Sequence, residues 1–106
     1  MCKNRRVRIR FTINVEEQTM LAAKQLALGC NSPAEVIRRA LAKLYDDIGE
    51  SQFVLIELPG LEDRVEMEAE ADASIPQSLS ELMPLVKAQT QGGVIRIAIR
   101  HFCQPG

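Results

Sequence analysis

The sequence predicts an α+β protein, with a strand and two helices in residues 1–49 and a small β-β-α-β domain in residues 50–106. Three patterns support this: an alternating basic segment at residues 6–13, two helix-capping signals after it, and alternating segments in the second half. The chain has 106 residues, 46% of them apolar and 25% charged. This ordinary globular composition excludes a wholly disordered or collagen-like chain. Because units of about 40–60 residues bury too little surface to be stable alone, we expect oligomerisation.

The first predicted strand has one basic and one apolar face. In RVRIRFTI polar and apolar side chains alternate, which is typical of a half-buried strand. The polar face consists of Arg6, Arg8, Arg10 and Thr12, and the apolar face of Val7, Ile9, Phe11 and Ile13. No other segment of the first fifty residues reads as a strand. We therefore expect this strand to pair with a strand of another chain.

Two helices are predicted between residues 14 and 49. Asn14 and Glu17 have the spacing of a capping box ahead of VEEQTMLAAKQLAL, and Gly29 ends that helix. Ser32 caps the second helix, and Pro33 occupies its first position. Together with the apolar face of the strand, the second helix is expected to supply the core of a dimer through Val36, Ile37, Ala40, Leu41 and Leu44.

The order basic strand, helix, short turn, helix resembles the ribbon-helix-helix family of bacterial, phage and plasmid repressors. RVRIRFTINVEEQ, LAAKQLALG and SPAEVIRRAL carry the resemblance, which covers roughly residues 5–48. It implies an intertwined homodimer whose two strands pair antiparallel and enter the DNA major groove. A two-stranded ribbon fits a groove about 12 Å wide, and alternate side chains on its outer face reach base edges.

The resemblance also implies roles for individual residues. The positions that contact bases in the family are matched by Arg8, Arg10 and Thr12. The second helix of the family points its N-terminus at a phosphate, a role that falls here on Ser32 and Ala34. The chain departs from the family at this point, because Pro33 supplies no N–H and the link between the helices is one residue longer than usual. Further phosphate contacts are assigned to Lys3, Arg5 and Arg6.

The second half predicts strands at FVLIEL, RVEMEAEAD and VIRIAIRHF and a helix within residues 79–91. In the last strand Arg96 and Arg100 are expected to point outward. RVEMEAEAD carries a row of carboxylates on one face, which we expect to be solvated or paired with these two arginines. Alternatively, the row is an acidic docking surface for a basic partner or a mimic of nucleic acid.

Charge and composition limit the remaining classes of function. Residues 1–50 carry nine basic and six acidic side chains, and residues 51–106 carry four and eight, so two opposed fields underlie the net charge of −1. Carboxylates on alternate strand positions spread over about 13 Å, too far to converge on one ion, so no metal or other cofactor is expected. His101 and Cys103 match no catalytic spacing, and we expect no enzyme. Three scattered cysteines and no apolar leader or membrane-length run favour the cytoplasm.

These observations predict a homodimeric repressor that binds double-stranded DNA through its N-terminal ribbon. The acidic second half then adds an oligomer contact, a partner site or an effector pocket. The rival prediction is a protein-binding inhibitor or antitoxin, of a toxin-antitoxin, phage or anti-CRISPR-like kind. In that case the acidic half binds a partner protein while the N-terminal half dimerises.

Overall fold

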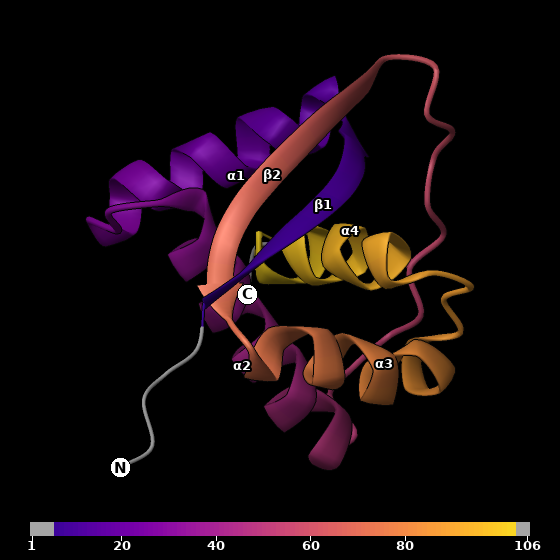
Figure 1. Ribbon diagram of the computed structural model, residues 1–106. Coiled ribbons are helices and arrows are strands. Elements are labelled where there is room, and N and C mark those ends of the chain that lie inside the picture. Colours follow the sequence, from indigo (N-terminus) through magenta and orange to yellow (C-terminus); the bar gives the residue numbers. More distant parts are fainter. Residues whose placement is uncertain (1–5, 104–106) are drawn as a thin grey trace, which may run out of the picture.

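The computed structural model describes residues 6–103. The element order is β1 (Arg6–Asn14), α1 (Val15–Leu28), α2 (Pro33–Gly49), β2 (Arg64–Asp72), α3 (Ser74–Val86) and α4 (Gln91–Phe102). In this range the protein is α+β, with a two-stranded antiparallel sheet and four helices (Figure 1). Residues 50–63 form a linker from α2 to β2 without helix or strand.

The partner of β1 is β2 of the same chain. The two nine-residue strands pair antiparallel over their whole length, with Arg6 opposite Asp72 and Arg10 opposite Glu68 at the centre. The prediction that β1 needs a strand from another chain is therefore wrong. RVEMEAEAD has the same length and the same alternation as β1, so it satisfies the backbone groups of β1 within one molecule.

The predicted N-terminal helices are confirmed together with their caps. The Asn14 side chain accepts a hydrogen bond from the Glu17 N–H at 2.7 Å, and Glu17 Oε1 accepts one from the Asn14 N–H at 3.0 Å. Gly29 ends α1 in the left-handed conformation, with φ of 67°. Ser32 Oγ accepts a hydrogen bond from the Glu35 N–H at the start of α2. Local capping chemistry thus defines both ends of α1 and the start of α2.

The second half differs from the predicted β-β-α-β order. FVLIEL belongs to the linker, where Phe53, Ile56 and Leu58 pack on the core while Val54 and Leu55 are exposed. The segment is apolar because it covers the core. It does so in an irregular conformation, without pairing as a strand. The predicted helix within residues 79–91 is α3, which begins earlier, at Ser74.

VIRIAIRHF forms most of the helix α4, so the prediction of a third strand is wrong. Thr90 caps this helix by accepting a hydrogen bond from the Gly93 N–H at 3.0 Å. Residues 94–99 are buried without interruption, so both faces of the helix are covered. A short apolar run that is buried all round does not distinguish a helix from a strand by its period.

The chain contains the order strand, helix, helix twice. Corresponding features lie 58 residues apart: Arg6 and Arg64 begin the strands, Gly29 and Lys87 end helices in the left-handed conformation, and Ser32 and Thr90 cap helices. The same offset aligns Val36-Ile37-Arg38 with Val94-Ile95-Arg96. The second half is therefore a structural repeat of the first.

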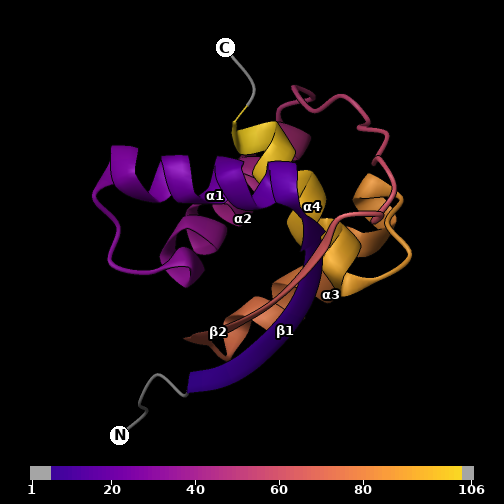
Figure 2. The same ribbon diagram turned by 90° about the horizontal axis from the view of Figure 1, so that it is seen from above.

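The two halves share one hydrophobic core. Helix α2 packs against α4, α1 against α2, and α3 against α4, while α4 lies under β1 and α2 contacts β2 (Figures 1 and 2). Of the residues predicted to form a dimer core, Val7 is half-buried and the others are buried among side chains of the same chain: Ile9, Phe11, Ile13, Val36, Ile37, Ala40, Leu41 and Leu44. Between residues 6 and 103, no helix combines the length and the apolar character needed to cross a membrane.

Candidate functional site

The solvent-facing side of the sheet carries two rows of opposite charge. We refer to it as the ribbon face: Arg6, Arg8, Arg10 and Thr12 of β1, with Arg64, Glu66, Glu68, Glu70 and Asp72 of β2. Side chains of Arg8 and Arg10 are 63% and 79% exposed. The four arginines and four carboxylates give this face a formal charge of zero.

The acidic row is paired with β1. Arg10 Nε lies 3.0 Å from Glu68 Oε2, and Arg8 lies 3.6 Å from Glu68 and 4.0 Å from Glu70. All four side chains are solvent-accessible, and exposed pairs contribute only about 0–1 kcal/mol each. Both arginines therefore remain available to a binding partner at little cost.

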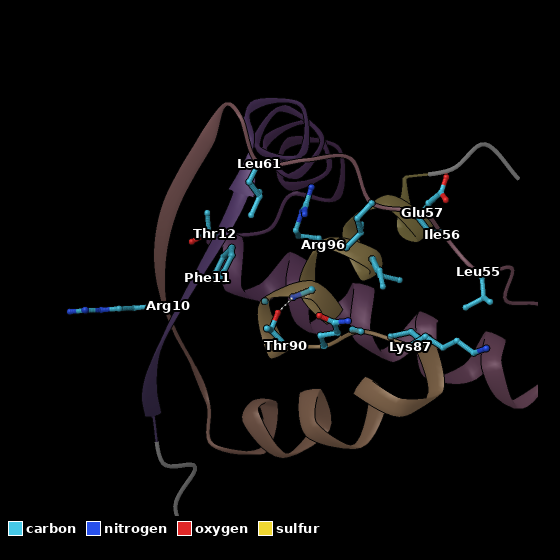
Figure 3. A pocket seen from close by; sticks show the side chains of 17 residues that line it. Arg10, Phe11, Thr12, Leu55, Ile56, Glu57, Leu61, Lys87, Thr90 and Arg96 are labelled. Carbon is cyan, nitrogen blue, oxygen red and sulfur yellow. Dashed lines mark hydrogen bonds between the residues drawn. The ribbon is translucent and has the colours of Figure 1, made fainter.

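Helices α2 and α4, which correspond to each other in the repeat, both begin beside the ribbon face. A cavity of about 350 Å³ is lined by Ser32 and Ala34 of the α2 start and by Arg6 and Asp72 of the ribbon face. A larger one, of about 990 Å³, lies between the α4 start, β1 and the linker. Figure 3 shows Arg10 extending away from the other side chains of that cavity, toward solvent. The helix dipole favours an anion at each helix start, but few N–H groups are free there, because Pro33 has none and those of Glu35 and Gly93 donate to the capping side chains.

A buried ion cluster joins α1 to α4. The side chain of Glu17 is fully buried, and its carboxylate accepts hydrogen bonds from Arg96 Nε at 2.8 Å and Arg100 Nε at 2.6 Å. Arg96 also donates to the Pro59 carbonyl at 2.7 Å, which holds the linker against α4. The prediction that Arg96 and Arg100 point outward toward the acidic row is wrong, because in a helix they face Glu17.

Burial alone raises the pKa of Glu17, but hydrogen bonds from Arg96, the Asn14 N–H and Arg100 outweigh it and leave the pKa below its ordinary value. The pKa of Arg100 is raised: burial acts against the shift, and hydrogen bonds to Glu17 and Glu16 outweigh it. Glu17 and Arg100 are therefore both charged at neutral pH. Every oxygen of the Glu17 carboxylate is used within the ion cluster, which gives the cluster a structural role.

His101 and Cys103 have separate partners. His101 Nε2 lies 2.6 Å from Asp47 Oδ2 and its ring packs edge-on against Phe53. Hydrogen bonds from His101, which has the larger effect, and from Lys43 lower the pKa of Asp47. Burial raises the pKa of the Cys103 thiol, which makes it a weak nucleophile. Within residues 6–103, no three potential metal ligands of the His, Cys, Asp and Glu types cluster.

The structure brings most of the predicted contact residues to one side of the molecule. Arg8 and Arg10 are exposed, Thr12 is half-buried opposite Glu66, and Arg6 lines the same cavity as Ser32 at the start of α2. Ala34 is buried. Lys3 and Arg5 lie outside the described residues.

The acidic row, Glu66, Glu68, Glu70 and Asp72, shares one surface with the arginines, which was not predicted from the sequence. Two signals point to this: the matching alternation of the two nine-residue segments, and the Val-Ile-Arg repeat that follows each of them at a fixed distance. Comparisons with protein-family models, curated proteins and solved structures give no match to the chain.

Proposed function

We propose that the protein is a single-chain ribbon-helix-helix protein that binds DNA and represses transcription. In this assignment β1, α1 and α2 form one half and β2, α3 and α4 form the other. One chain then supplies both strands of the ribbon, which two chains supply in the family. The repeat at 58 residues and the antiparallel pairing of β1 with β2 support the assignment.

One observation carries the function: exposed arginines on a two-stranded ribbon that is bordered by two helix N-termini. The ribbon fits the major groove, where Arg8 and Arg10 donate to guanine and Thr12 contacts a base edge. Arg6 and the first turn of α2, with Ser32 and Ala34, lie where a phosphate would be held. The corresponding first turn of α4, with Thr90, Gly92 and Gly93, lines the larger cavity beside β1, where the Gly92 N–H is the candidate donor because the Gly93 N–H already donates to Thr90.

The acidic row determines how such binding depends on sequence and salt. Because the ribbon face has no net charge, its attraction to phosphates in general is weak. Affinity then depends on base contacts. Only the few basic groups around the ribbon contact phosphates and displace counterions from the DNA. We expect a shallow dependence of affinity on salt, in contrast to a basic DNA-binding domain.

Selection from randomised duplexes, followed by fluorescence anisotropy, tests the proposal. The Arg10→Gln variant is expected to weaken binding to the enriched duplex by about 1–3 kcal/mol, since a bidentate guanine contact is lost. Lys43→Gln is the matched control, because it removes the same charge from α2 where Lys43 pairs with Asp47. The absence of any enriched sequence, or equal losses in the two variants, would contradict the proposal.

A second candidate function is a protein-binding inhibitor or antitoxin that engages a basic partner. It is favoured by two carboxylates of the acidic row: among the described residues, Glu66 and Asp72 form no ion pair. A stoichiometric complex with a basic protein, weakened by Glu66→Gln in a chain that binds no duplex, would favour this candidate over DNA binding.

A further inference from the structure

The two strands of the ribbon carry different side chains at corresponding positions. With the 58-residue offset, the base-contact positions of β1 and their counterparts on β2 are Arg8 and Glu66, Arg10 and Glu68, and Thr12 and Glu70. A homodimeric ribbon presents the same side chains twice and therefore matches a palindromic site. A ribbon with donors on one strand and acceptors on the other lacks that symmetry.

We infer that the DNA target is asymmetric, with guanine beneath β1 and cytosine beneath the centre of β2. This inference rests on the proposed function. In the major groove guanine presents two acceptors, O6 and N7, whereas cytosine presents the N4 amino donor. A carboxylate accepts from that amino group and is repelled by the guanine acceptors. Arginine has the opposite preference, so each strand of the ribbon selects a different base.

Arg10 and Glu68 lie where one G·C pair, or two adjacent pairs, would be read. They are directly opposite each other at the centre of the two strands, and their side chains meet at 3.0 Å on the exposed face. The two side chains thus present a donor group, on Arg10, beside an acceptor group, on Glu68. A G·C base pair offers the complementary pattern, because the O6 and N7 acceptors of guanine lie beside the N4 amino donor of cytosine. Opening this exposed ion pair costs little, so both side chains can turn to the bases.

The experiment is duplex selection with the unmodified protein and with Glu68→Gln, followed by titration of single-base variants of the enriched site. We expect a non-palindromic site bound by one chain. In Glu68→Gln the preference for cytosine at one position is expected to fall about tenfold, which is the effect of about 1.4 kcal/mol within the range for one base contact. The other positions keep their preferences. Glu81→Gln, which changes an exposed carboxylate of α3, is the control and leaves the profile unchanged.

Two results would overturn the inference while leaving DNA binding intact. One is a palindromic enriched site bound by two chains. The other is a Glu68→Gln variant that binds all duplexes more tightly by the same factor, because the carboxylate then acts only by repelling phosphates. Failure of every form of the protein to enrich a sequence would instead remove the proposed function itself.

Discussion

Replacing Glu17 with alanine is expected to lower the free energy of unfolding by about 3–5 kcal/mol, the usual loss when one partner of a buried ion pair is removed. Arg96 is only 6% exposed and would lose its charged partner, and Arg100 would keep only Glu16. Urea denaturation measures the change. Glu16→Ala is the matched control, because Glu16 pairs with the same cluster from an exposed position. Its loss is expected to stay below about 1 kcal/mol.

The stabilisation that Glu17 contributes is expected to depend on pH. The folded-state pKa of Glu17 lies below the ordinary value of 4.5, so its ionised form stabilises the protein above that pH. This stabilisation is lost as the pH falls through the folded-state pKa. The difference in unfolding free energy between the unmodified protein and Glu17→Ala is therefore expected to be constant above pH 4.5 and to narrow below it. A difference that widens in acid would contradict the buried cluster.

Replacing Ile95 with alanine is expected to cost about 2–5 kcal/mol of stability, because a large side chain is removed from a closely packed core. Ile95 in α4 and Ile37 in α2 are both 1% exposed and occupy corresponding positions of the repeat. Ile37→Ala should therefore cost a similar amount. Leu26→Ala, at an 85% exposed position of α1, should change stability by less than about 0.5 kcal/mol. Chemical denaturation of the three variants compares them, and an Ile95→Ala loss as small as that of Leu26→Ala would contradict the packing of α4.

The first half of the fold could be predicted because its signals are local. Strict alternation identifies β1, and the side chains of Asn14 and Ser32 make the hydrogen bonds that begin α1 and α2. Gly29 ends α1 because glycine readily adopts a positive φ. Each of these features depends on residues within a few positions of one another.

The second half could not be predicted in the same way, because its signals depend on tertiary contacts. Isoleucines on alternate positions of α4 give it the period of a strand, and only burial on all sides makes that pattern compatible with a helix. Arg96 reads as a surface residue until Glu17, 79 positions earlier, is placed beside it. FVLIEL is apolar because it covers the core as a linker.

The candidate site could be predicted only in part, because some of its features are local and others depend on tertiary contacts. Exposed arginines on β1 follow from alternation alone. The acidic row follows equally from alternation in β2, but its position beside the arginines depends on which strand pairs with β1. Once that pairing is known, the opposed charges of the two halves become neighbouring rows of one surface.

The most direct test of the single-chain ribbon is a disulfide between its two strands. Arg8 and Glu70 lie directly opposite each other, at a separation typical of cross-strand pairs and compatible with a disulfide. Arg8→Cys and Glu70→Cys are introduced together into a chain whose own three cysteines have been replaced. After oxidation, mass analysis is expected to show a disulfide within one chain, formed at a rate independent of protein concentration. Disulfide-linked dimers whose yield rises with concentration would show that the strands pair between chains and would contradict the single-chain ribbon.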